Sequence, residues 1–334
     1  MREAFVAYGA ARGGAGRPKC VLFVVQDGER NVFDQRHLEY ELQRFTEPVV
    51  PVFRLAFSEV LQRTRLDDSR ALLYTPPHRS PDRGGAFEVA VVYLRAGYGP
   101  GDYPDRSAWE ARYHLERSAA IKCPTVLTQI AGTKKVQQVL ATPSSSPSST
   151  SPSSNTTTTA IPPMLAHFIP DPAAAGPVAR TFTNIYPLDS TSDAGRLGRT
   201  LALDPVRSQA HVLKPQREGG GNNVYRGAIP GFLQGDGGAT SVGIPEAHWA
   251  SHVLMELITP PPVRNTILRA GRLERGGVVC ELGVYGSCVW DGAGAGAKVL
   301  HNETAGYLLR TKGDQSEEGG VAAGFGCMDS VALV

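Results

Sequence analysis

The stretch Lys214-Pro215-Gln216-Arg217-Glu218-Gly219-Gly220-Gly221-Asn222-Asn223 joins charged side chains to three consecutive glycines. It follows an apolar run at 211–213 that is typical of the end of a β-strand. Lys214 carries a point charge suited to phosphate, Arg217 carries a planar fork of donors, and Glu218 is the hard oxygen ligand that Mg²⁺ prefers. Because glycine has no β-carbon, backbone N–H groups in this stretch can close over a polyphosphate. The two asparagines add amide donors and tolerate positive φ.

This combination predicts a site for nucleotide phosphates and magnesium. A flexible glycine linker is the alternative that the same residues allow. The stretch is not a Walker A loop, because the order G-x-x-x-x-G-K-[ST] is absent.

The composition limits the classes of protein to which the chain can belong. Its 334 residues are 41% hydrophobic and 20% charged, which is ordinary for a globular protein of about two domains. A net charge of +2 gives no electrostatic case for nucleic acid or for an anionic membrane. No apolar run approaches the roughly 20 residues of a spanning helix, and Met1–Lys19 lacks the apolar core of a secretory signal. The five cysteines are dispersed without a C-x-x-C pair, so we expect no disulfide framework and a reducing, cytoplasmic location.

Two other site types find little support. His248 and His252 would share a face of a helix near Glu246, as zinc ligands do, but 251–258 is typical of a strand and no third ligand is evident. We therefore predict no metal site there. A G-x-S-x-G nucleophile elbow is also absent, which argues against hydrolase chemistry of that kind.

Strands alternate with helices in the first part of the chain. The expected elements are strands at 20–26, 49–55 and 90–94, helices at 33–45 and 109–121, and a further candidate strand at 126–130. Such alternation predicts an open α/β sheet, whose ligands lie beyond the carboxyl ends of the strands. The loops at 29–35 and 95–98 occupy that location.

The second part is expected to be richer in strands. We expect a helix from Lys134 to Leu140, a disordered Ser/Thr/Pro-rich insertion at 143–159 that is most simply a tolerated loop expansion, and irregular structure at 227–245. Strands are expected at 253–258, 278–290 and 305–309. Glu256 and Glu281 lie within two of these strands, where a carboxylate needs a partner or a ligand. A second small-residue loop is expected at 319–324. If the strands are neighbours, the two mobile loops come together with the acids Glu218 and Glu281 and the cations Lys214, Arg310 and Lys312.

The motifs along the chain resemble those of eukaryotic glutathione synthetases, a family of ATP-grasp ligases. The resemblance rests on E-R-N-V-F-D-Q (29–35), R-A-G-Y (95–98), W-E-A-R (109–112), E-R-S-A-A-I-K-C-P (116–124), A-G-T-K-K-V-Q-Q (131–138), K-P-Q-R-E-G-G-G-N-N (214–223), P-P-P-V-R-N (260–265), E-L-G-V-Y-G (281–286), L-L-R-T-K (308–312) and G-G-V-A-A-G (319–324). Their order and spacing extend from about residue 20 to the C-terminus.

The resemblance implies an α/β fold: an open parallel-sheet substrate domain at 18–130, and an ATP-grasp α+β domain with an antiparallel sheet at 131–142 and 160–334. It implies a ligase that joins γ-glutamylcysteine to glycine while ATP becomes ADP and phosphate, with Mg²⁺ as cofactor, in a homodimer. The implied ATP contacts are Lys134, Lys214, Pro215, Gln216, Arg217, Gly219, Gly220, Gly221, Asn222, Asn223, Tyr225, Met255, Glu256, Leu257, Ile258, Glu281, Lys312 and Glu318.

The same resemblance places the peptide substrate, the metal and the catalytic group. The implied substrate contacts are Glu29, Arg30, Asn31, Gln35, Arg95, Ala96, Gly97, Tyr98, Arg310, Val321 and Ala322. Glu218 is the implied magnesium ligand, and Arg310 is assigned to the oxyanion as the catalytic residue. The Val-Ala-Ala of 321–323 resembles the version associated with glycine rather than β-alanine as the acceptor.

The sequence departs from the family at three places. Family members extend further at the N-terminus, where they supply an arginine, a serine and two more magnesium ligands; Leu257 stands where lysine is common; and 227–245 lacks an expected helical pattern. Three interpretations therefore stay open: a competent ligase, a nucleotide-binding module without turnover, and a ligase for another amine such as β-alanine. Taken singly, 95–98 can be a strand-end turn, Arg310 and Lys312 a solvated strand end, and Glu281 a buried ion-pair partner.

Overall fold

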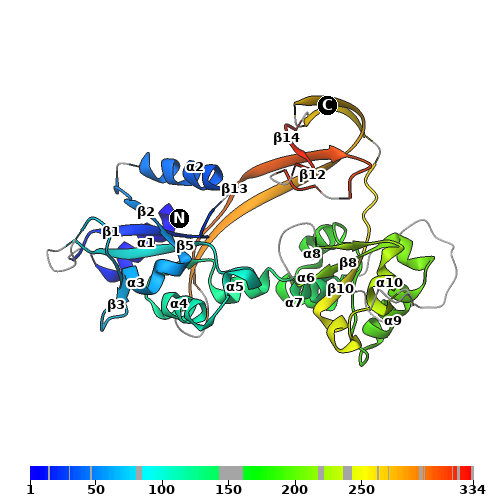
Figure 1. Ribbon diagram of the computed structural model, residues 1–334, viewed down its shortest axis with the longest axis horizontal. Helices are drawn as coiled ribbons and strands as arrows, with labels where there is room; N and C mark the ends of the chain where they lie inside the picture. Colours follow the sequence, from blue (N-terminus) through cyan, green and yellow to red (C-terminus); the bar gives the residue numbers. More distant parts are fainter. Residues whose placement is uncertain are drawn as a thin grey trace. The chain divides into compact units, whose positions relative to one another are not determined.

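The chain forms two compact units in the computed structural model. One unit comprises Met1–Gln129 and Arg264–Val334, and the other comprises Ile130–Val263 (Figure 1). The structure describes residues 1–13, 16–29, 31–45, 47–79, 85–142, 161–216, 222–235, 243–261, 263–269, 271–292, 296, 298–317, 319–321 and 324–331. The predicted insertion at 143–159 lies outside these residues.

A mixed sheet forms the centre of the first unit. Its strands follow the order β2-β1-β5-β4-β3, and β6 also pairs with β5. The parallel part consists of β1 (Lys19–Val25), β2 (Val52–Ala56), β5 (Phe87–Arg95) and β6 (Ile121–Cys123); the antiparallel edge consists of β3 (Thr64–Leu66) and β4 (Leu72–Tyr74). The predicted open α/β sheet is confirmed, but it is not purely parallel, because β3 and β4 form a hairpin that adds to β5.

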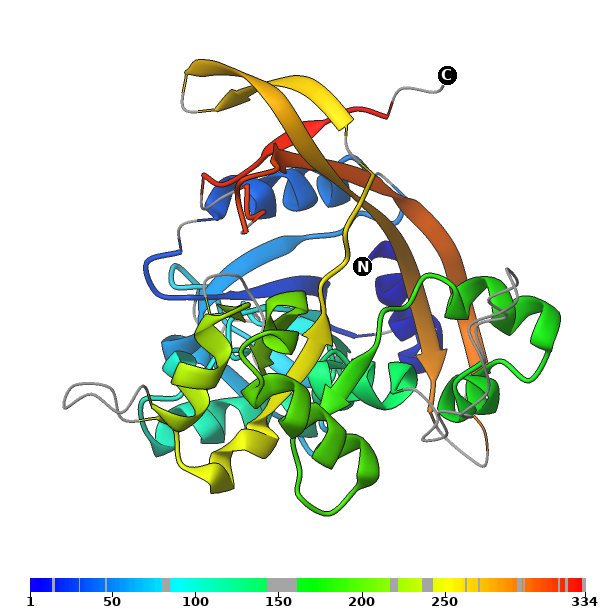
Figure 2. The same ribbon diagram turned by 90° about the vertical axis from the view of Figure 1, so that its right-hand side faces the viewer.

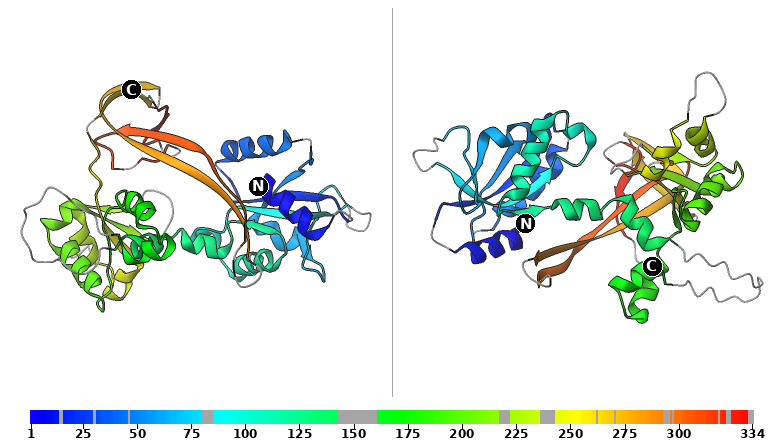
Figure 3. Two further views of the ribbon diagram at one scale, coloured as in Figure 1. Left: turned by 180° about the vertical axis from the view of Figure 1, so that it is seen from behind. Right: turned by 90° about the horizontal axis from the view of Figure 1, so that it is seen from below.

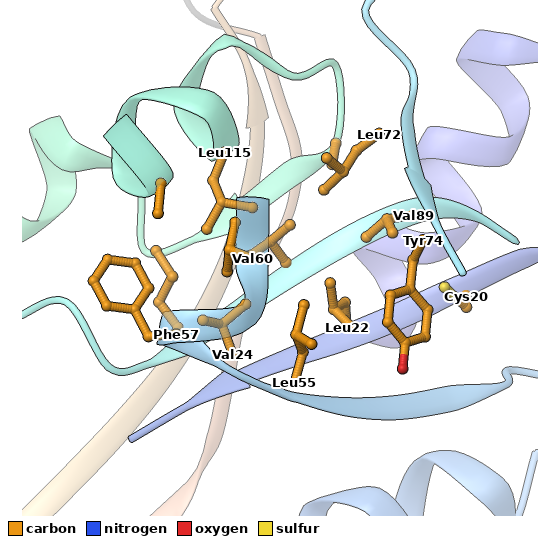
Figure 4. Packing of buried hydrophobic residues seen from close by; sticks show 14 of the residues in the cluster. Cys20, Leu22, Val24, Leu55, Phe57, Val60, Leu72, Tyr74, Val89 and Leu115 are labelled. Carbon is orange, nitrogen blue, oxygen red and sulfur yellow. The ribbon is translucent and has the colours of Figure 1, made fainter. Parts of the chain in front are cut away.

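Helices cover both faces of this sheet. They are α1 (Arg2–Arg12), α2 (Val32–Gln43), α3 (Val60–Arg63) and α4 (Arg106–Arg117), with short 3₁₀ turns η1 (Phe57–Glu59) and η3 (Pro100–Asp102). A further helix, α5 (Val126–Ala131), follows β6 and has no buried residue. Alternate residues of β1 face opposite layers: Leu22 packs with Val60 of α3 and Leu115 of α4, whereas Phe23 packs with residues of α1 and α2. Figure 4 shows the first of these two clusters. The continuous apolar run of β1 is thus explained by burial on both faces.

Two expectations in this unit are wrong. The helix expected at 109–121 ends at Arg117, and Ile121 begins β6. Residues 126–130, a candidate strand, belong to α5. The hydroxyl of Thr125 accepts a hydrogen bond from the N–H of Thr128 at 3.1 Å, which satisfies a donor at the start of that helix.

An antiparallel sheet forms the centre of the second unit, in the order β7-β10-β8-β9. Its strands are β7 (Ile185–Pro187), β8 (His211–Pro215), β9 (Val224–Tyr225) and β10 (His252–Glu256). The helices are α6 (Lys134–Ala141), α7 (Pro163–Phe168), α8 (Pro172–Ala179), α9 (Asp193–Leu203) and α10 (Ala228–Gln234), with 3₁₀ turns η4 (Arg207–Ala210) and η5 (Glu246–Ser251). Figure 3 shows this unit from two further sides.

The two faces of this second sheet pack against different helices. Leu213 and Leu254 lie in a buried cluster with residues of α9 and α10. Val253 and Ile185 face the other way and pack with Ala141 of α6. The helix predicted at 134–140 is therefore confirmed, and its position is on the face of Val253.

The segment 227–245, expected to be irregular, contains α10. Ile229 and Leu233 are four residues apart and almost fully buried, which is the spacing of one helix face. The many neighbouring glycines obscured this short pattern in the sequence.

Helix α9 approaches the end of β7 so closely that two of its positions accept only glycine. A β-carbon at Gly195 would lie 2.3 Å from the carbonyl oxygen of Asp189, and one at Gly198 would lie 2.4 Å from that of Pro187. The hydroxyl of Ser192 caps the helix by accepting the N–H of Gly195 at 3.0 Å.

A third, antiparallel sheet is formed by the C-terminal part. It has the order β11-β12-β13-β14, with β11 (Val263–Arg269), β12 (Arg272–Asp291), β13 (Lys298–Gly313) and β14 (Cys327–Asp329). The strands expected at 278–290 and 305–309 are present but longer than predicted. Figure 2 shows the curvature of the long β12–β13 pair, and Val289 of β12 packs against the α1–α2 side of the first sheet. Among the described residues, every helix is too short or too polar to cross a membrane.

Candidate functional site

Lys214 and Pro215 are the last residues of β8. Lys214 is paired with Val253 of β10, and Met255 is paired with Val212, so these four side chains share one face of the sheet. The backbone N–H of Gln216 donates to the carbonyl of Ser251 at 3.2 Å, which continues the ladder one step beyond β8. Residues 217–221, including Glu218, lie outside the described part. The chain is described again at Asn222 and Asn223, and the Asn223 amide donates to the Tyr225 hydroxyl at 3.1 Å.

Lys134 is the first residue of α6, on this same face of the sheet. The N–H of its neighbour Lys135 donates to the side-chain oxygen of Gln216 at 2.8 Å. The structure thus brings the helix that carries Lys134 to the strand end that carries Lys214.

Met255 and Glu256 end β10, and Leu257 and Ile258 follow it. The Glu256 carboxylate points to the face opposite Lys214, where it accepts from the Asn184 amide at 3.0 Å and from the Tyr186 hydroxyl at 3.3 Å. Burial and this neighbouring carboxylate raise the pKa of Tyr186 to about 12. The expectation that Glu256 needs a partner is confirmed. Its partners are Tyr186 of β7 and Asn184, which immediately precedes β7.

Glu281, Arg310 and Lys312 meet on the β12–β13 pair. Glu281 lies directly opposite Arg310 in the register, and Arg310 donates to its carboxylate at 2.7 Å. The Lys312 ammonium lies 4.0 Å from the same carboxylate and donates to the carbonyl of Glu317 at 3.0 Å. The Glu281 side chain is 39% exposed, so it is an ion-pair partner but not a buried one. Of the other two residues expected in this cluster, Lys214 belongs to another sheet in the other compact unit, and Glu218 lies outside the described residues.

The small-residue loop passes beside this cluster. A β-carbon at Gly319 would lie 3.0 Å from the Glu281 carboxylate, so the loop backbone lies against the ion pair. Val321 accepts the N–H of Gly324 at 2.9 Å. Glu318 and Ala322 lie outside the described residues.

The loop after β1 is held by a chain of polar contacts. Glu29 accepts the N–H of Asn31 at 2.8 Å and the side-chain amide of Gln35 at 2.6 Å. Gln35 is fully buried, and its oxygen accepts from Arg54 of β2 at 2.6 Å. Arg54 also donates to the buried carboxylate of Glu39 at 2.5 Å. Arg30 lies outside the described residues.

The loop after β5 is organised by Asp102. Its carboxylate accepts the backbone N–H groups of Gly97, Tyr98 and Gly99 at 3.0, 3.2 and 3.2 Å, and its other oxygen accepts from Gln26 at 3.0 Å. Gly97 has φ of +76°, which other residues rarely adopt. The segment 95–98 is therefore a strand-end turn, with Ala96 buried beneath it.

Arg95 ends β5 with its Nε atom buried and without a hydrogen-bond partner in the described part of the chain. A buried donor of this kind is suited to an incoming carboxylate. Arg95 lies two residues after Tyr93 in β5, so the two side chains point to the same face of the sheet. This is the face covered by α1 and α2, and Gln35 belongs to α2. The loops after β1 and β5 therefore present residues on the same side of this sheet.

A cavity of about 690 Å³ lies on the other side of the sheet, among Gln26, Phe57 and Ala111. Its lining includes Asp102 and one of the predicted substrate contacts, Ala96. Asp102, Arg54 and Glu39 are site-supporting residues that sequence reasoning missed. The only local signal was the turn composition Gly-Pro-Gly-Asp at 99–102.

Magnesium finds no complete set of ligands in the described ranges, which hold no cluster of three His, Cys, Asp or Glu side chains placed for a metal. Glu218, the expected ligand, is not among them. The His248–His252 pair starts in η5 and ends in β10, and nearby Glu246 pairs with Arg199.

A solved structure has a similar fold. A glutathione synthetase-like effector from Globodera pallida, solved in its apo form, superposes with a TM-score of 0.62 at 16% identity, covering 100% of this chain and 59% of that one. Residues 1–333 match the family model described as eukaryotic glutathione synthase, ATP binding domain, and the chain belongs to this family.

Curated relatives agree with this assignment. The glutathione synthetase large chain of Schizosaccharomyces pombe is 39% identical over 314 residues, covering 94% of this chain and 55% of the relative. The glutathione synthetase of Xenopus laevis is 37% identical (94% and 57% covered), and that of Homo sapiens is also 37% identical (93% and 56% covered). The chain thus spans little more than half the length of these relatives.

Proposed function

We propose that the protein is an ATP-dependent ligase that joins γ-glutamylcysteine to glycine and yields glutathione, ADP and phosphate. The observation that carries this proposal is the family match over residues 1–333. The relatives named glutathione synthetase support the substrates. The substrate-binding domain would be 18–130, and the ATP-grasp domain would be 131–142 with 160–334.

Lys134 and Lys214 would bind the phosphates of ATP, because α6, which begins at Lys134, packs on the face of the second sheet to which Lys214 belongs. Gln216, Asn222, Asn223 and Tyr225 would add donors near them. The segment Met255–Ile258 would hold the nucleotide through its backbone at Glu256, because the Glu256 side chain is bound to Asn184 and Tyr186 on the opposite face.

The peptide substrate carries carboxylates and an ammonium group. Arg95, whose Nε atom has no hydrogen-bond partner among the described residues, would bind a carboxylate, and Glu29 would face the ammonium group. Asn31, Gln35 and Tyr98 would complete this subsite from the two loops. Val321, with Ala322, would select glycine over a longer amine.

The chemistry would proceed in two transfers. The cysteinyl carboxylate oxygen forms a bond to the γ-phosphorus of ATP while the bond to ADP breaks, which gives an acyl phosphate. The amine of glycine then attacks the acyl carbon, loses a proton, and phosphate leaves with the electron pair. Arg310 would stabilise the oxyanion of this second step, and Glu281 would hold its guanidinium in place.

Magnesium is part of the proposal through Glu218, and bound there it would neutralise phosphate charge. The resemblance supports a homodimer, and the dispersed cysteines support a cytoplasmic location. Sedimentation of the purified chain would test the dimer.

Phosphate release by the purified chain tests the proposed reaction. We expect release from magnesium-ATP only when γ-glutamylcysteine and glycine are both present, with glycine preferred to β-alanine. Arg310→Ala should lower kcat by about 100-fold, as expected for loss of an oxyanion donor, while Arg272→Ala, an exposed arginine on the same sheet, should not. ATP binding without dependent release would disprove the ligase activity, and an Arg310→Ala effect confined to KM would disprove the oxyanion role.

A further inference from the structure

Two residues of the W-E-A-R motif, Trp109 and Arg112, belong neither to the implied ATP contacts nor to the implied substrate contacts. They lie three residues apart in α4 and therefore on one side of that helix. Both are connected to a single atom in the turn after β5, the carbonyl oxygen of Gly97. Arg112 reaches this oxygen directly, and Trp109 acts on it through Tyr103.

The guanidinium of Arg112 is a buried cation with two partners. Only 6% of the residue is exposed, and its Nη1 donates to the Gly97 carbonyl at 3.1 Å. Its Nε donates to the carboxylate of Glu116, one turn further along α4, at 3.0 Å. The pairing with Glu116 offsets the cost of removing the cation from water, and it also fixes the direction in which Nη1 points.

Tyr103 and Gln129 supply further donors to the same oxygen. The Tyr103 hydroxyl donates to the Gly97 carbonyl at 2.6 Å, and the side-chain amide of Gln129 donates to it at 3.3 Å. The Tyr103 ring is held on two sides, because Trp109 stacks on it with ring centroids 4.0 Å apart and Phe57 meets it edge-on at 5.8 Å. This packing restricts the ring and so directs its hydroxyl.

The peptide group that joins Gly97 to Tyr98 is held at both ends by groups of opposite charge. Its carbonyl accepts from the Arg112 guanidinium, and its N–H donates to the Asp102 carboxylate at 3.2 Å. Rotation of this peptide plane would therefore separate a buried cation and a carboxylate from their partners at the same time. Because the backbone of Tyr98 starts from this plane, the plane sets the position of the Tyr98 side chain.

We propose that Arg112, with Trp109 acting through Tyr103, is a positioning residue of the peptide subsite. It fixes the turn 95–98 before the peptide arrives, so that the residues of this turn do not have to be ordered on binding. The proposal rests on the peptide binding proposed above, whereas the fixed turn is a property of the ligand-free chain. Loss of such preorganisation weakens binding and raises KM, and it leaves the chemical step largely intact.

Four substitutions in the full chain test this role. Arg112→Met keeps an unbranched side chain but donates no hydrogen bond, and Arg112→Lys restores a cation. Tyr103→Phe removes only the hydroxyl, and Trp109→Leu removes only the stacked ring, so both remain informative if Arg112→Met does not fold. The matched control is Arg106→Met, at an exposed arginine of the same helix.

Hydrogen–deuterium exchange of the Tyr98 amide, without ligand, measures whether the turn is fixed. Arg112→Met should speed this exchange about tenfold or more, because the peptide plane is released. Tyr103→Phe and Trp109→Leu should speed it by a smaller factor of about three, as expected for a neutral donor. Arg112→Lys should restore most of the protection, and Arg106→Met should exchange like the wild type.

Steady-state phosphate release, with each substrate varied in turn, measures the consequence for binding. Arg112→Met should raise the KM for γ-glutamylcysteine about tenfold, the effect of losing one hydrogen bond from a charged donor. The KM for ATP and kcat should change by less than about twofold. A residue that only stabilised the fold would lower the urea midpoint without this selective change in one KM.

Unchanged Tyr98 exchange in both Arg112→Met and Tyr103→Phe would overturn the positioning role. Faster exchange with a wild-type KM for γ-glutamylcysteine would overturn its link to peptide binding. If the wild-type chain releases no phosphate with γ-glutamylcysteine and glycine, the proposed function fails, and the exchange experiment still decides whether Arg112 fixes the turn.

Discussion

Glu39 is a buried carboxylate that holds two arginines near the loop after β1. It accepts from Arg54 at 2.5 Å and from Arg36 at 2.6 Å, and only 2% of it is exposed. Arg54 in turn reaches Gln35, which binds Glu29. This chain of hydrogen bonds therefore connects α2 and β2 to the loop that follows β1.

Removing the charge of Glu39 should be costly, because Arg54 would keep its own charge in a poorly hydrated position. Glu39→Gln should lower the free energy of unfolding by about 3 kcal/mol, the usual penalty for breaking a buried ion pair from one side. Urea denaturation measures this. The exposed pair Glu41–Arg44 provides the control: Glu41→Gln should change stability by less than about 0.5 kcal/mol.

His114 of α4 should make the stability of the fold depend on pH. Burial, and secondarily the charge of Arg117, lower its pKa below the ordinary value, and its Nε2 lies 3.0 Å from the Thr64 hydroxyl. The unfolded chain therefore binds a proton more readily than the folded one. The stabilisation is complete above the unfolded pKa of about 6.5 and is lost as the pH falls below it.

His114→Gln, which retains a donor for Thr64, should reduce the loss of stability between pH 7 and pH 5. The difference between urea midpoints at the two pH values measures it. The exposed His37 serves as control, since His37→Gln should leave that difference as in the wild type. A difference unchanged in His114→Gln would contradict the assignment.

At the scale of elements, the turn after β5 depends on one carboxylate. Asp102 accepts three consecutive backbone N–H groups and thereby fixes the exit of Arg95 and Tyr98 from the sheet. Its removal leaves those donors without their partner.

Asp102→Ala should lower the free energy of unfolding by about 2 kcal/mol and raise the KM for the peptide more than that for ATP. Asp68→Ala, at an exposed aspartate of the same unit, should alter neither quantity. If Asp102→Ala were as stable as the wild type, the turn at 97–99 would not depend on the Asp102 carboxylate.

The elements that could be predicted are those whose signal is local. The strands at 20–26 and 90–94 were predicted correctly because burial on both faces leaves a continuous apolar run. Residues 126–130 gave the same apolar signal, yet the Thr125 cap starts a helix there. In 228–234 only two buried residues, Ile229 and Leu233, mark the helix, which is too few to outweigh the glycines around them.

The same is true of the candidate site: residues in local motifs could be predicted, and contacts between distant residues could not. The motifs indicated Glu281, Arg310 and Lys312, and the register of β12 and β13 brings these three together. The contacts of Gln216 with Lys135 and of Asp102 with Gln26 join residues 81 and 76 positions apart, and no local pattern records such pairings.

At the scale of the whole molecule, the second unit is one continuous segment. Residues 130–263 contain a complete four-stranded sheet with a buried cluster on each face. A segment with its own core is expected to fold alone.

A fragment of residues 130–263 should therefore melt cooperatively, as followed by circular dichroism. Leu254→Ala, which removes a fully buried side chain, should lower its stability by about 3 kcal/mol. The exposed Leu197→Ala should have little effect. A fragment with no cooperative transition would show that the unit needs the remainder of the chain.

The close approach of α9 to β7 limits how this unit can diverge. At Gly195 and Gly198 only a hydrogen atom fits against the carbonyls of Asp189 and Pro187. Neither glycine can be replaced by a larger residue while the backbone stays in place, because even a methyl group would force the helix and the strand apart. Descendants of this sequence can vary the surrounding surface, but they must inherit this junction unaltered or rebuild helix and strand together.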